Sequence, residues 1–487
     1  MKTIDQLHAD VQRAFKAAMK CADSSAKCTL AEKEAALWTK TLALGAALTA
    51  LFLFRQAARS RLARYTHEGN TFVIAESWRS SSLGTRFGKI PFVRPVGRQV
   101  GKRTAQADLP VDRELGLCGG FSLGVAMAIA RLCAMMAFAQ ARITFALFHE
   151  WSPSSRATLR LVDAVGGEAR AFIEQAPAPA GDGDILVIQV DGRGAPMITT
   201  TEYARRAKQR TKRERRVTQR AQRHTRRKAH PKIRRKKGDK SKNAKVGFVA
   251  VIYTLKTTTA GLEGPINKQV IATFESHRAL MLWAKHEAIK RGYGKKRTLF
   301  IADGSDHIWR LKDELFPDAE GCLDWFHVVE KLWEIGSMLH REGSDQLRAW
   351  VAECTALLRV GKAAELTNKL EYYKRRIPKT KAKNRKRVSD IIIHFGEHLE
   401  NMRYDQLRRD GLDIGSGAVE GAVRNVIAVR LDGPGMRWGR ERSELLLHLR
   451  CILVSGQWDA FANYLAARNG VTLNAQPIPA SPYAQAA

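Results

Sequence analysis

The sequence predicts an α/β domain with the element order β-β-β-α-β-α-β, interrupted by a helical insertion and preceded by a mainly helical N-terminal region. Two observations lead to this prediction. Between residues 184 and 325, short apolar runs alternate with amphipathic stretches in that order. Residues 328–410 then repeat their apolar side chains at helical spacing. A chain of 487 residues has the length for two to four domains.

Residues 1–66 form the first predicted region and are expected to be helical. Within it, Thr41–Phe54 (TLALGAALTALFLF) is apolar over 14 residues, whereas about 20 are needed to cross a bilayer, so we expect a buried helix. The seven Cys residues are scattered without a Cys-x-x-Cys pair, which is typical of reduced thiols. The sequence therefore predicts a cytoplasmic protein with no membrane segment.

Residues 67–170 form the second region, in which short strands (TFVIAESW, GKIPFVRPV) precede helices. Helices over 136–149 and 153–165 are separated by three residues, with Ser152 as N-cap and Pro153 at the first helical position. Two helices joined by a tight turn suit a DNA-reading helix-turn-helix, and an ordinary helical hairpin is the alternative. The side chains expected to face the groove are Ser154, Ser155, Arg156 and Arg160.

A Pro/Gly/Ala-rich linker over 171–183 leads into the α/β region of residues 184–327. Its expected strands span 184–190, 246–255, 269–276, 298–302 and 321–325, and its helices span 277–291 and 309–316. After the helical insertion of 328–410, residues 411–470 complete the same domain with a helix that opens at Gly415-Ser416-Gly417. Residues 471–487 are expected to be a flexible tail.

The charge of the chain indicates a polyanionic partner. It has 82 Lys and Arg against 48 Asp and Glu, a net charge of +34, which favours nucleic acid or an anionic membrane. Residues 205–245 hold a net +19 of this excess and interrupt the hairpin between the first two strands. We expect this basic insertion to contact DNA phosphates, and a merely solvated charge run is the alternative. The arginines expected to bind DNA are Arg205, Arg206, Arg215, Arg216, Arg234, Arg235, Arg437 and Arg440.

Three acidic residues stand where they would bind metal. Asp191 is expected to end the first strand and Asp303 the fourth, two strands that are neighbours in such a sheet, and a later helix carries Glu420. Converging carboxylates repel one another, and Mg²⁺ or Mn²⁺ would relieve this repulsion. Two ions about 3.5–4 Å apart suit an in-line phosphoryl displacement. A Gly after each Asp leaves room for a phosphate, although Asp-Gly is also an ordinary turn pair.

Asp324 and His327 (LDWFHVVEKL) form a rival constellation. Asp324 is an alternative to Asp303 as the second metal ligand, and His327 is placed to bond that carboxylate or a phosphate. The alternative is a buried histidine that orients the strand–helix junction. The sequence contains no GxxxxGK[ST] loop and no G-x-S-x-G motif, so it does not support a P-loop ATPase or a hydrolase of the latter type.

Three segments together resemble a known family of enzymes. VIQVDGRGAP, then IADGSDHIWRLKDELFPDAEGCLDWFHVVEKLW, and then SGAVEGAVRNVIAVRLDGPGMRWGRERSELLLHLRCILVSGQWDAF resemble the catalytic core of bacterial insertion-sequence DDE transposases, in the broad Mutator-like group that includes ISKra-type elements. The resemblance covers about residues 184–461, and more weakly 109–165. Residues 1–66 have no counterpart in it, and the Cys pair common upstream of LPVDRELGL in this group is missing here.

The resemblance implies an RNase H-like core in which Asp191, Asp303 and Glu420 are the catalytic metal ligands. Asp324 and His327 match an accessory D-x-x-H motif, and residues 328–410 match an insertion domain. Such an enzyme binds the inverted repeats of its element, cuts DNA with a metal-activated water and joins the 3′-OH to target DNA, as a homo-oligomer. Two other hypotheses stay open: an RNase H-like structure-specific nuclease or resolvase, and a catalytically dead basic nucleic-acid-binding protein.

Overall fold

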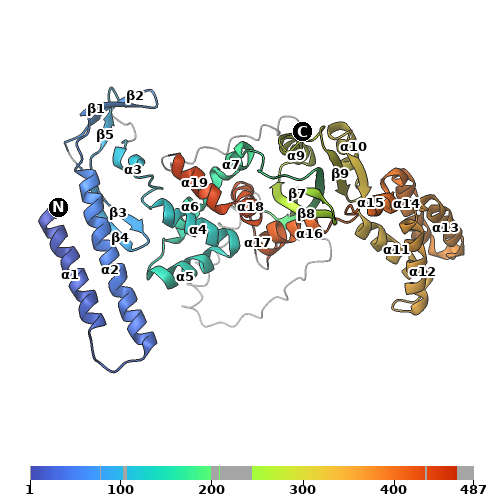
Figure 1. Ribbon diagram of the computed structural model, residues 1–487, viewed down its shortest axis with the longest axis horizontal. Helices are drawn as coiled ribbons and strands as arrows, with labels where there is room; N and C mark the ends of the chain where they lie inside the picture. The colour runs from blue at the N-terminus through green and yellow to red at the C-terminus, as the bar shows by residue number, and fades with distance from the viewer. Residues whose placement is uncertain are drawn as a thin grey trace. The chain divides into compact units, whose positions relative to one another are not determined.

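The computed structural model describes residues 2–76, 78–102, 107–198, 204, 208, 244–433 and 436–468 (Figure 1). These residues divide into two compact units. One unit comprises residues 2–173 and 456–468, and the other comprises residues 174–455. Residues 456–468, which the sequence groups with the core that precedes them, therefore belong to the N-terminal unit.

The N-terminal unit begins with two long helices, α1 (Ile4–Ala22) and α2 (Leu30–Ala57). Each starts with a capping box, in which Thr3 pairs with Gln6 and Thr29 with Glu32. The two helices pack against each other, and α2 also packs against strand β4. Only the last turns of α2 enter the apolar core, whose buried members are Leu53, Ala57, Leu83, Ile90, Phe92 and Val111.

Helix α2 corrects the expectation of a buried helix over residues 41–54. Leu42, Leu53 and Ala57 are its buried residues, whereas Leu48 and Phe52 are each 49% exposed. A 28-residue helix is about 42 Å long, and although α1, β4 and the end of α5 contact it, most of its residues stay exposed or half-buried. Among the described residues it is the one helix long and apolar enough to cross a membrane, a criterion that core helices and signal sequences also meet.

Five short strands follow: β1 (Arg64–His67), β2 (Asn70–Ile74), β3 (Arg79–Thr85), β4 (Gly88–Arg94) and β5 (Gly97–Gln99). Strands β1, β2 and β5 form one antiparallel sheet, and β3 and β4 form a hairpin. Strand β1 lies partly inside the stretch expected to be helical. Glu68 and Gly69 have positive φ angles, which the two-residue turn between β1 and β2 requires.

The remaining helices of this unit are α3 (Pro110–Glu114), α4 (Leu123–Met135), α5 (Phe138–His149), α6 (Ser155–Gly167), α7 (Ala169–Gln175) at its boundary, and α19 (Trp458–Ala467). The cap of α6 differs from the expected one. Ser154 Oγ accepts a hydrogen bond from Ala157 N, so Ser152 and Pro153 lie in the turn. Arg142 fixes this turn, because its guanidinium donates to Pro153 O and Ser155 Oγ.

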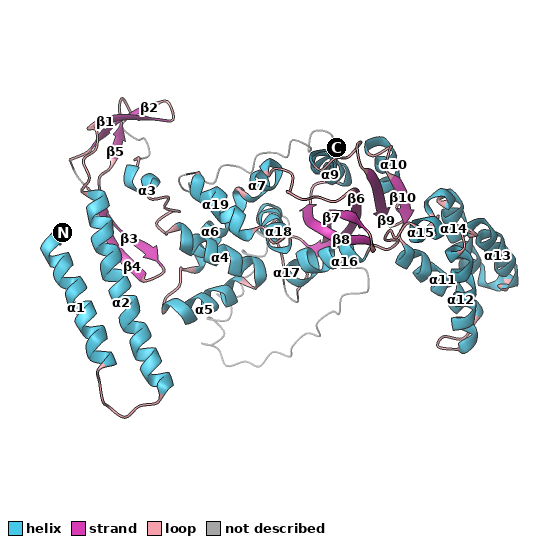
Figure 2. Ribbon diagram, in the orientation of Figure 1, coloured by secondary structure: helices cyan, strands magenta, loops and turns pink. Residues whose placement is uncertain are grey.

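A five-stranded mixed sheet lies at the centre of the second unit (Figure 2). Its strands are β6 (Ile185–Pro196), β7 (Ala244–Thr258), β8 (Gly261–Thr273), β9 (Arg297–Ala302) and β10 (Glu320–Leu323). Helix α9 (His277–Lys290) follows β8, and α10 (Asp306–Leu315) follows β9. The spatial order is β10-β9-β6-β7-β8, with β10, β9 and β6 parallel and β6, β7 and β8 antiparallel.

Strand β6 is longer than the apolar run that predicts it. Its parallel pairing with β9 stops at Val190↔Ala302, but its antiparallel pairing with β7 continues to Pro196↔Ala244. Asp191 therefore lies within β6 and not at its end, and Asp191-Gly192 is not a turn. The residues after Val190 are mostly polar or glycine, so the apolar pattern of the sequence does not predict that the strand continues. Backbone hydrogen bonds to β7 extend the strand through these residues.

Helices fill residues 325–409, which Figure 1 shows gathered as α11 to α15. Their bounds are α11 (Trp325–Leu339), α12 (Asp345–Arg359), α13 (Ala363–Arg376), η2 (Lys379–Lys381), α14 (Ala382–Glu397), η3 (Leu399–Asn401) and α15 (Tyr404–Arg409). The chain then returns to the sheet through α16 (Gly417–Val423), the π-helical turn η4 (Arg424–Ala428), α17 (Val429–Leu431) and α18 (Arg440–Val454). The buried Glu444 on α18 accepts hydrogen bonds from Thr273 Oγ1 and Phe274 N, which fixes α18 to the end of β8.

Candidate functional site

The register of the parallel strands aligns three aspartates. Val190 of β6 pairs with Ala302 of β9, and Ala302 pairs with Leu323 of β10. The residues that follow these three are Asp191, Asp303 and Asp324. Because neighbouring strands lie about 4.8 Å apart, the three residues occupy adjacent positions at one edge of the sheet.

Asp191 and Asp303 are half-buried and lie close enough to interact electrostatically. Burial raises the pKa of Asp191, and the carboxylates of Asp303 and Glu420 raise it further, while a hydrogen bond from Gly192 N opposes the rise. Asp303 Oδ1 accepts from Ser305 N in the turn that leads into α10. The carboxylates of Asp303 and Glu420 thus lie within electrostatic range of Asp191, and a cation would relieve this repulsion.

Glu420 reaches this edge because α16 is tied to the sheet by a buried glutamine. Gln189 of β6 is 1% exposed; its Oε1 accepts from Val419 N, and its Nε2 donates to Gly415 O and Tyr253 Oη. Ser416 Oγ donates to Glu420 Oε1 at 2.7 Å. An isolated buried amide would be costly, so these bonds explain why Gln189 sits within an otherwise apolar strand.

Asp324 is fully buried and acts as the cap of α11. One carboxylate oxygen accepts from His327 N and bonds His327 Nδ1 at 2.5 Å, and the other accepts from Ser416 N at 2.7 Å. Burial would raise the pKa of Asp324, but these hydrogen bonds hold it below its usual range. The same bond raises the pKa of His327, and Asp303 and Asp191 add to the rise. The buried carboxylate therefore orients the histidine, and His327 bonds Asp324 as the sequence predicts, whereas the buried histidine of the alternative is not found, because the His327 side chain is 35% exposed.

Two groups of side chains in the described part of the chain are arranged so that they could hold a metal ion. In the first group, Asp324, His327 and Glu420 bring one ligand atom each within 4.8 Å of one another. This group contains Asp324, which the sequence analysis gives as an alternative to Asp303 as the second metal ligand. It contains neither Asp191 nor Asp303, the two aspartates that the sequence favours as ligands. Among the described residues, Asp324 accepts three hydrogen bonds, whereas Asp191 and Asp303 each accept one, so the latter two carboxylates keep more acceptor capacity for an ion.

The second group consists of Asp306, His394 and His398. Its sequence signal is the four-residue spacing of the two histidines, which brings His394 on α14 and His398 at its C-terminal cap to the same side of the helix. Asp306 has no such signal, because it lies 88 residues before His394. One expectation is corrected here: a Cβ on Gly304 would overlap the His394 ring, so the space beside Gly304 is filled by a side chain and is not free for a phosphate.

The residues expected to bind DNA have mixed outcomes. Ser154, Ser155, Arg156 and Arg160 are all exposed on the first turns of α6, although the two serines already serve as a cap and as a partner of Arg142. Arg437 and Arg440 are exposed as well. Burial and then the charge of Arg440 lower the pKa of Lys245, and Lys245 pairs with Ala195 near the end of β6. The other predicted arginines, Arg205, Arg206, Arg215, Arg216, Arg234 and Arg235, lie outside the described residues.

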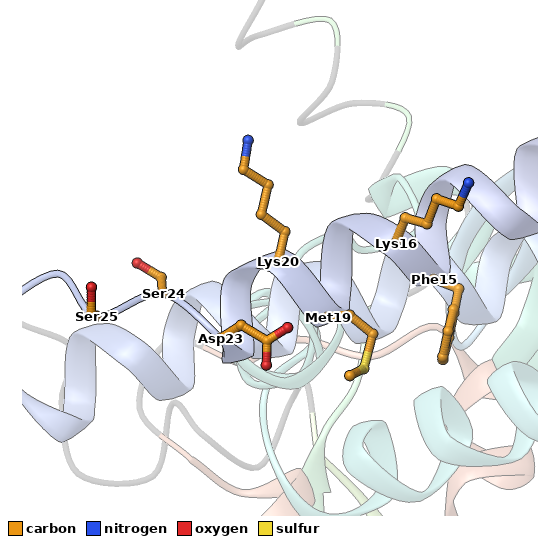
Figure 3. Close-up of a pocket in the computed structure, with 7 residues that line it drawn as sticks. All are labelled: Phe15, Lys16, Met19, Lys20, Asp23, Ser24 and Ser25. Carbon is orange, nitrogen blue, oxygen red and sulfur yellow. The ribbon is translucent and has the colours of Figure 1, made fainter.

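An open hollow at the end of α1 lies in the N-terminal unit (Figure 3). Lys16 and Lys20 extend to one side of the helix, and Phe15 and Met19 extend to another. Asp23, Ser24 and Ser25 complete its lining. None of the predicted site residues lines this hollow, whose lining holds one carboxylate. It therefore has no counterpart to the group of Asp191, Asp303, Asp324 and Glu420, which we call the acidic edge.

Comparison with known proteins gives no further identification. No protein-family model matches the sequence, and no curated protein sequence matches it.

Proposed function

We propose that this chain is a DDE transposase that cleaves and joins DNA strands with the help of divalent metal ions. The observation that carries the proposal is that Asp191 and Asp303 follow paired residues of two parallel strands, and that the carboxylates of Asp303 and Glu420 both interact electrostatically with that of Asp191. The strand order 5-4-1-2-3 within this sheet, numbered along the chain, supports an RNase H-like core. The resemblance of the flanking segments to insertion-sequence transposases supports the choice of strand transfer over simple cleavage.

In this proposal Asp191, Asp303 and Glu420 hold two Mg²⁺ or Mn²⁺ ions, whose oxygen-ligand preference the carboxylates satisfy. The bound ions would activate the attacking oxygen and stabilise the leaving oxygen of the phosphodiester. Asp324 fixes His327 so that Nδ1 is engaged and Nε2 is left to bond a phosphate or a neighbouring carboxylate. Gln189 and Ser416 hold the helix that carries Glu420.

Cationic side chains near the acids support DNA as the substrate. Lys245 and Arg440 lie toward the same end of β6 as Asp191, and the net charge of +34 favours a polyanion. The exposed turn of α6, with Arg156 and Arg160, is proposed to read the inverted repeats of the element. We further propose that the protein works as a homo-oligomer in the cytoplasm, because two DNA ends must be handled together. Its seven cysteines, all of them free, agree with that compartment.

The test uses the full-length protein and duplex DNA taken from either side of its own coding sequence. With Mg²⁺ or Mn²⁺, the protein is expected to nick the duplex at a fixed position and to join the new 3′-OH to a second DNA. Asp191→Asn, Asp303→Asn and Glu420→Gln should each remove both products while leaving salt-sensitive DNA binding intact. Asp345→Asn, at a side chain that is 97% exposed, is the matched control and should retain both products.

Each alternative function gives a different result in the same assay. A structure-specific nuclease would cleave branched DNA in preference to these ends and would give no joined product. A DNA-binding protein without catalysis would bind the duplex but release no cut strand at any metal concentration. Normal cleavage by all three acidic-residue variants would overturn the assignment of the site.

A further inference from the structure

We propose that Asp306, His394 and His398 form a second metal site, of the His₂Asp type, that binds Zn²⁺ and fastens the helical insertion to the sheet domain. This site is separate from the acidic edge and does not depend on the transposase proposal. Asp306 begins α10, whereas His394 and His398 lie on and just after α14. The site therefore joins two segments that are far apart along the chain.

The geometry of the three side chains fits one ion. One ligand atom from each lies within 4.8 Å of the other two. The rings of His394 and His398 have centroids 4.9 Å apart and are inclined at 70°, so two ring nitrogens can face a common point. A tetrahedral Zn²⁺ with ligand bonds of about 2.0–2.1 Å holds neighbouring ligand atoms about 3.3 Å apart, which small rotations of these side chains would reach.

A second observation, an unpartnered ring nitrogen, indicates that a metal ion binds between these side chains. His394 Nε2 is buried and has no hydrogen-bond partner among the described residues. A buried ring nitrogen without a partner is costly, and a metal ion at this position would satisfy it. His394 is also confined by packing, since its ring covers Gly304. His398 is 6% exposed, packs against Trp309 and lies 3.3 Å from the Asn401 amide through Nδ1, which holds the ring in place.

The chemistry of the ligands selects the metal. Two imidazole nitrogens and one carboxylate favour Zn²⁺ and related transition metals over Mg²⁺, which prefers oxygen. Asp306 is exposed, so an ion can enter from solvent and a water can take the fourth position. Two cations face the group, Lys331 and Arg387; Arg387 is already paired with Glu334, and Asp306 supplies the compensating negative charge.

The protonation state of His394 agrees with its assignment as a metal ligand. Burial, and then the charges of the neighbouring His398 and Lys331, lower the pKa of His394 to about 4. A neutral imidazole at neutral pH is the form that binds metal. A bound ion would hold α14 against Gly304, the residue after Asp303, so that the site would position the loop that carries one of the acids.

The test measures metal on the full-length protein after treatment with a chelator. Co²⁺ is added as the probe, and a tetrahedral nitrogen–oxygen site is expected to give intense visible absorption at one equivalent, which Zn²⁺ then removes. Asp306→Asn, whose side chain is exposed, and His398→Gln should each weaken Co²⁺ affinity at least 10-fold. His286→Gln, at an exposed histidine on α9, is the matched control and should bind Co²⁺ as the wild type does.

A variant at the acidic edge separates the two groups. His327→Gln should leave the Co²⁺ absorption unchanged if Asp306, His394 and His398 hold the ion. Loss of the absorption in His327→Gln, with retention in both Asp306→Asn and His398→Gln, would overturn the proposal. Absence of a tetrahedral Co²⁺ spectrum in the folded wild type would overturn it as well, whatever the outcome of the DNA assay.

Discussion

The acidic edge and the histidine group differ in how the chain assembles them. Asp191, Asp303 and Asp324 meet because each follows a residue in the same register row of parallel strands. Asp306 and His394 meet only because α14 packs on the turn after β9. The positions of the strands along the chain follow from local apolar patterns of the sequence, but the docking of an insertion helix does not. The two groups therefore show which kind of site a single sequence can reveal.

The largest expected effect tests the role of the acidic edge. Asp191→Asn should lower the rate of DNA cleavage on the order of 10³-fold or more, about 4 kcal/mol of transition-state stabilisation. The reason is that an amide cannot replace a carboxylate between two cations. Single-turnover cleavage measures the loss. Asp306→Asn is the contrasting variant from the group of Asp306, His394 and His398. An equal loss of cleavage in this variant would contradict the view that only the acidic edge takes part directly in the reaction.

The next effect is on stability. Asp324→Asn should lower the free energy of unfolding of the second unit by about 2–4 kcal/mol. The reason is that the amide NH₂ of the asparagine would face the N–H of either His327 or Ser416, so that two donors meet and one buried hydrogen bond is lost. Denaturant titration measures the change. Asp345→Asn should stay within about 0.5 kcal/mol of the wild type. Similar values for both variants would contradict the buried hydrogen-bond network.

Acid should act in opposite directions on the two groups in metal-free protein. The folded pKa of His394 is about 4, below the unfolded value near 6.5, so the unfolded state binds more protons between these values. Stability is then lost as the pH falls from about 6.5 toward 4, by on the order of 1–3 kcal/mol. Urea midpoints across this range measure the loss, and His394→Gln should reduce it. A pH dependence identical in the variant and the wild type would refute the expectation.

His327 supplies the contrast, because its pKa is raised, first of all by the bond to Asp324. Its contribution to stability is complete below the unfolded pKa and is lost as the pH rises through the higher folded value. The stability difference between the wild type and His327→Gln should therefore shrink toward alkaline pH. A difference that grew with pH would reverse the assigned charge state.

The smallest effect concerns the positioning of Glu420. Ser416→Ala removes one hydrogen bond to its carboxylate, which is worth about 0.5–1.5 kcal/mol and so about 2- to 10-fold in cleavage rate. Ser344→Ala, which removes a cap in the insertion, should leave the rate unchanged. A larger loss from Ser344→Ala would mean that the insertion controls the acidic edge more strongly than this local bond.

Much of the second unit could be predicted from its residues. Apolar runs bounded by charged residues give strands at the right places, and the helices over 277–291 and 309–316 correspond to α9 and α10. The end of β6 could not be predicted, because pairing with β7 continues through polar residues. The prediction of Ser152 as the cap of α6 was wrong, because a second serine, Ser154, follows two residues later and caps the helix instead.

The candidate site was only partly predictable for the same kind of reason. The acids follow from strand register, but the part played by Gln189 depends on a bond to Val419, 230 residues away. The exposure of α2 depends on what packs beside it and not on its own apolarity. Long-range packing of this kind leaves no periodicity in the sequence.

The shared carboxylate of Asp324 has a consequence for how this protein can change over generations. One oxygen holds His327 and the other holds the backbone that precedes the Glu420 helix. A single replacement at position 324 therefore disturbs both partners at once, and neither can be adjusted alone from that position. In a randomised library selected for activity, position 324 should stay fixed, while positions 327 and 416 accept the substitutions that tune each partner separately.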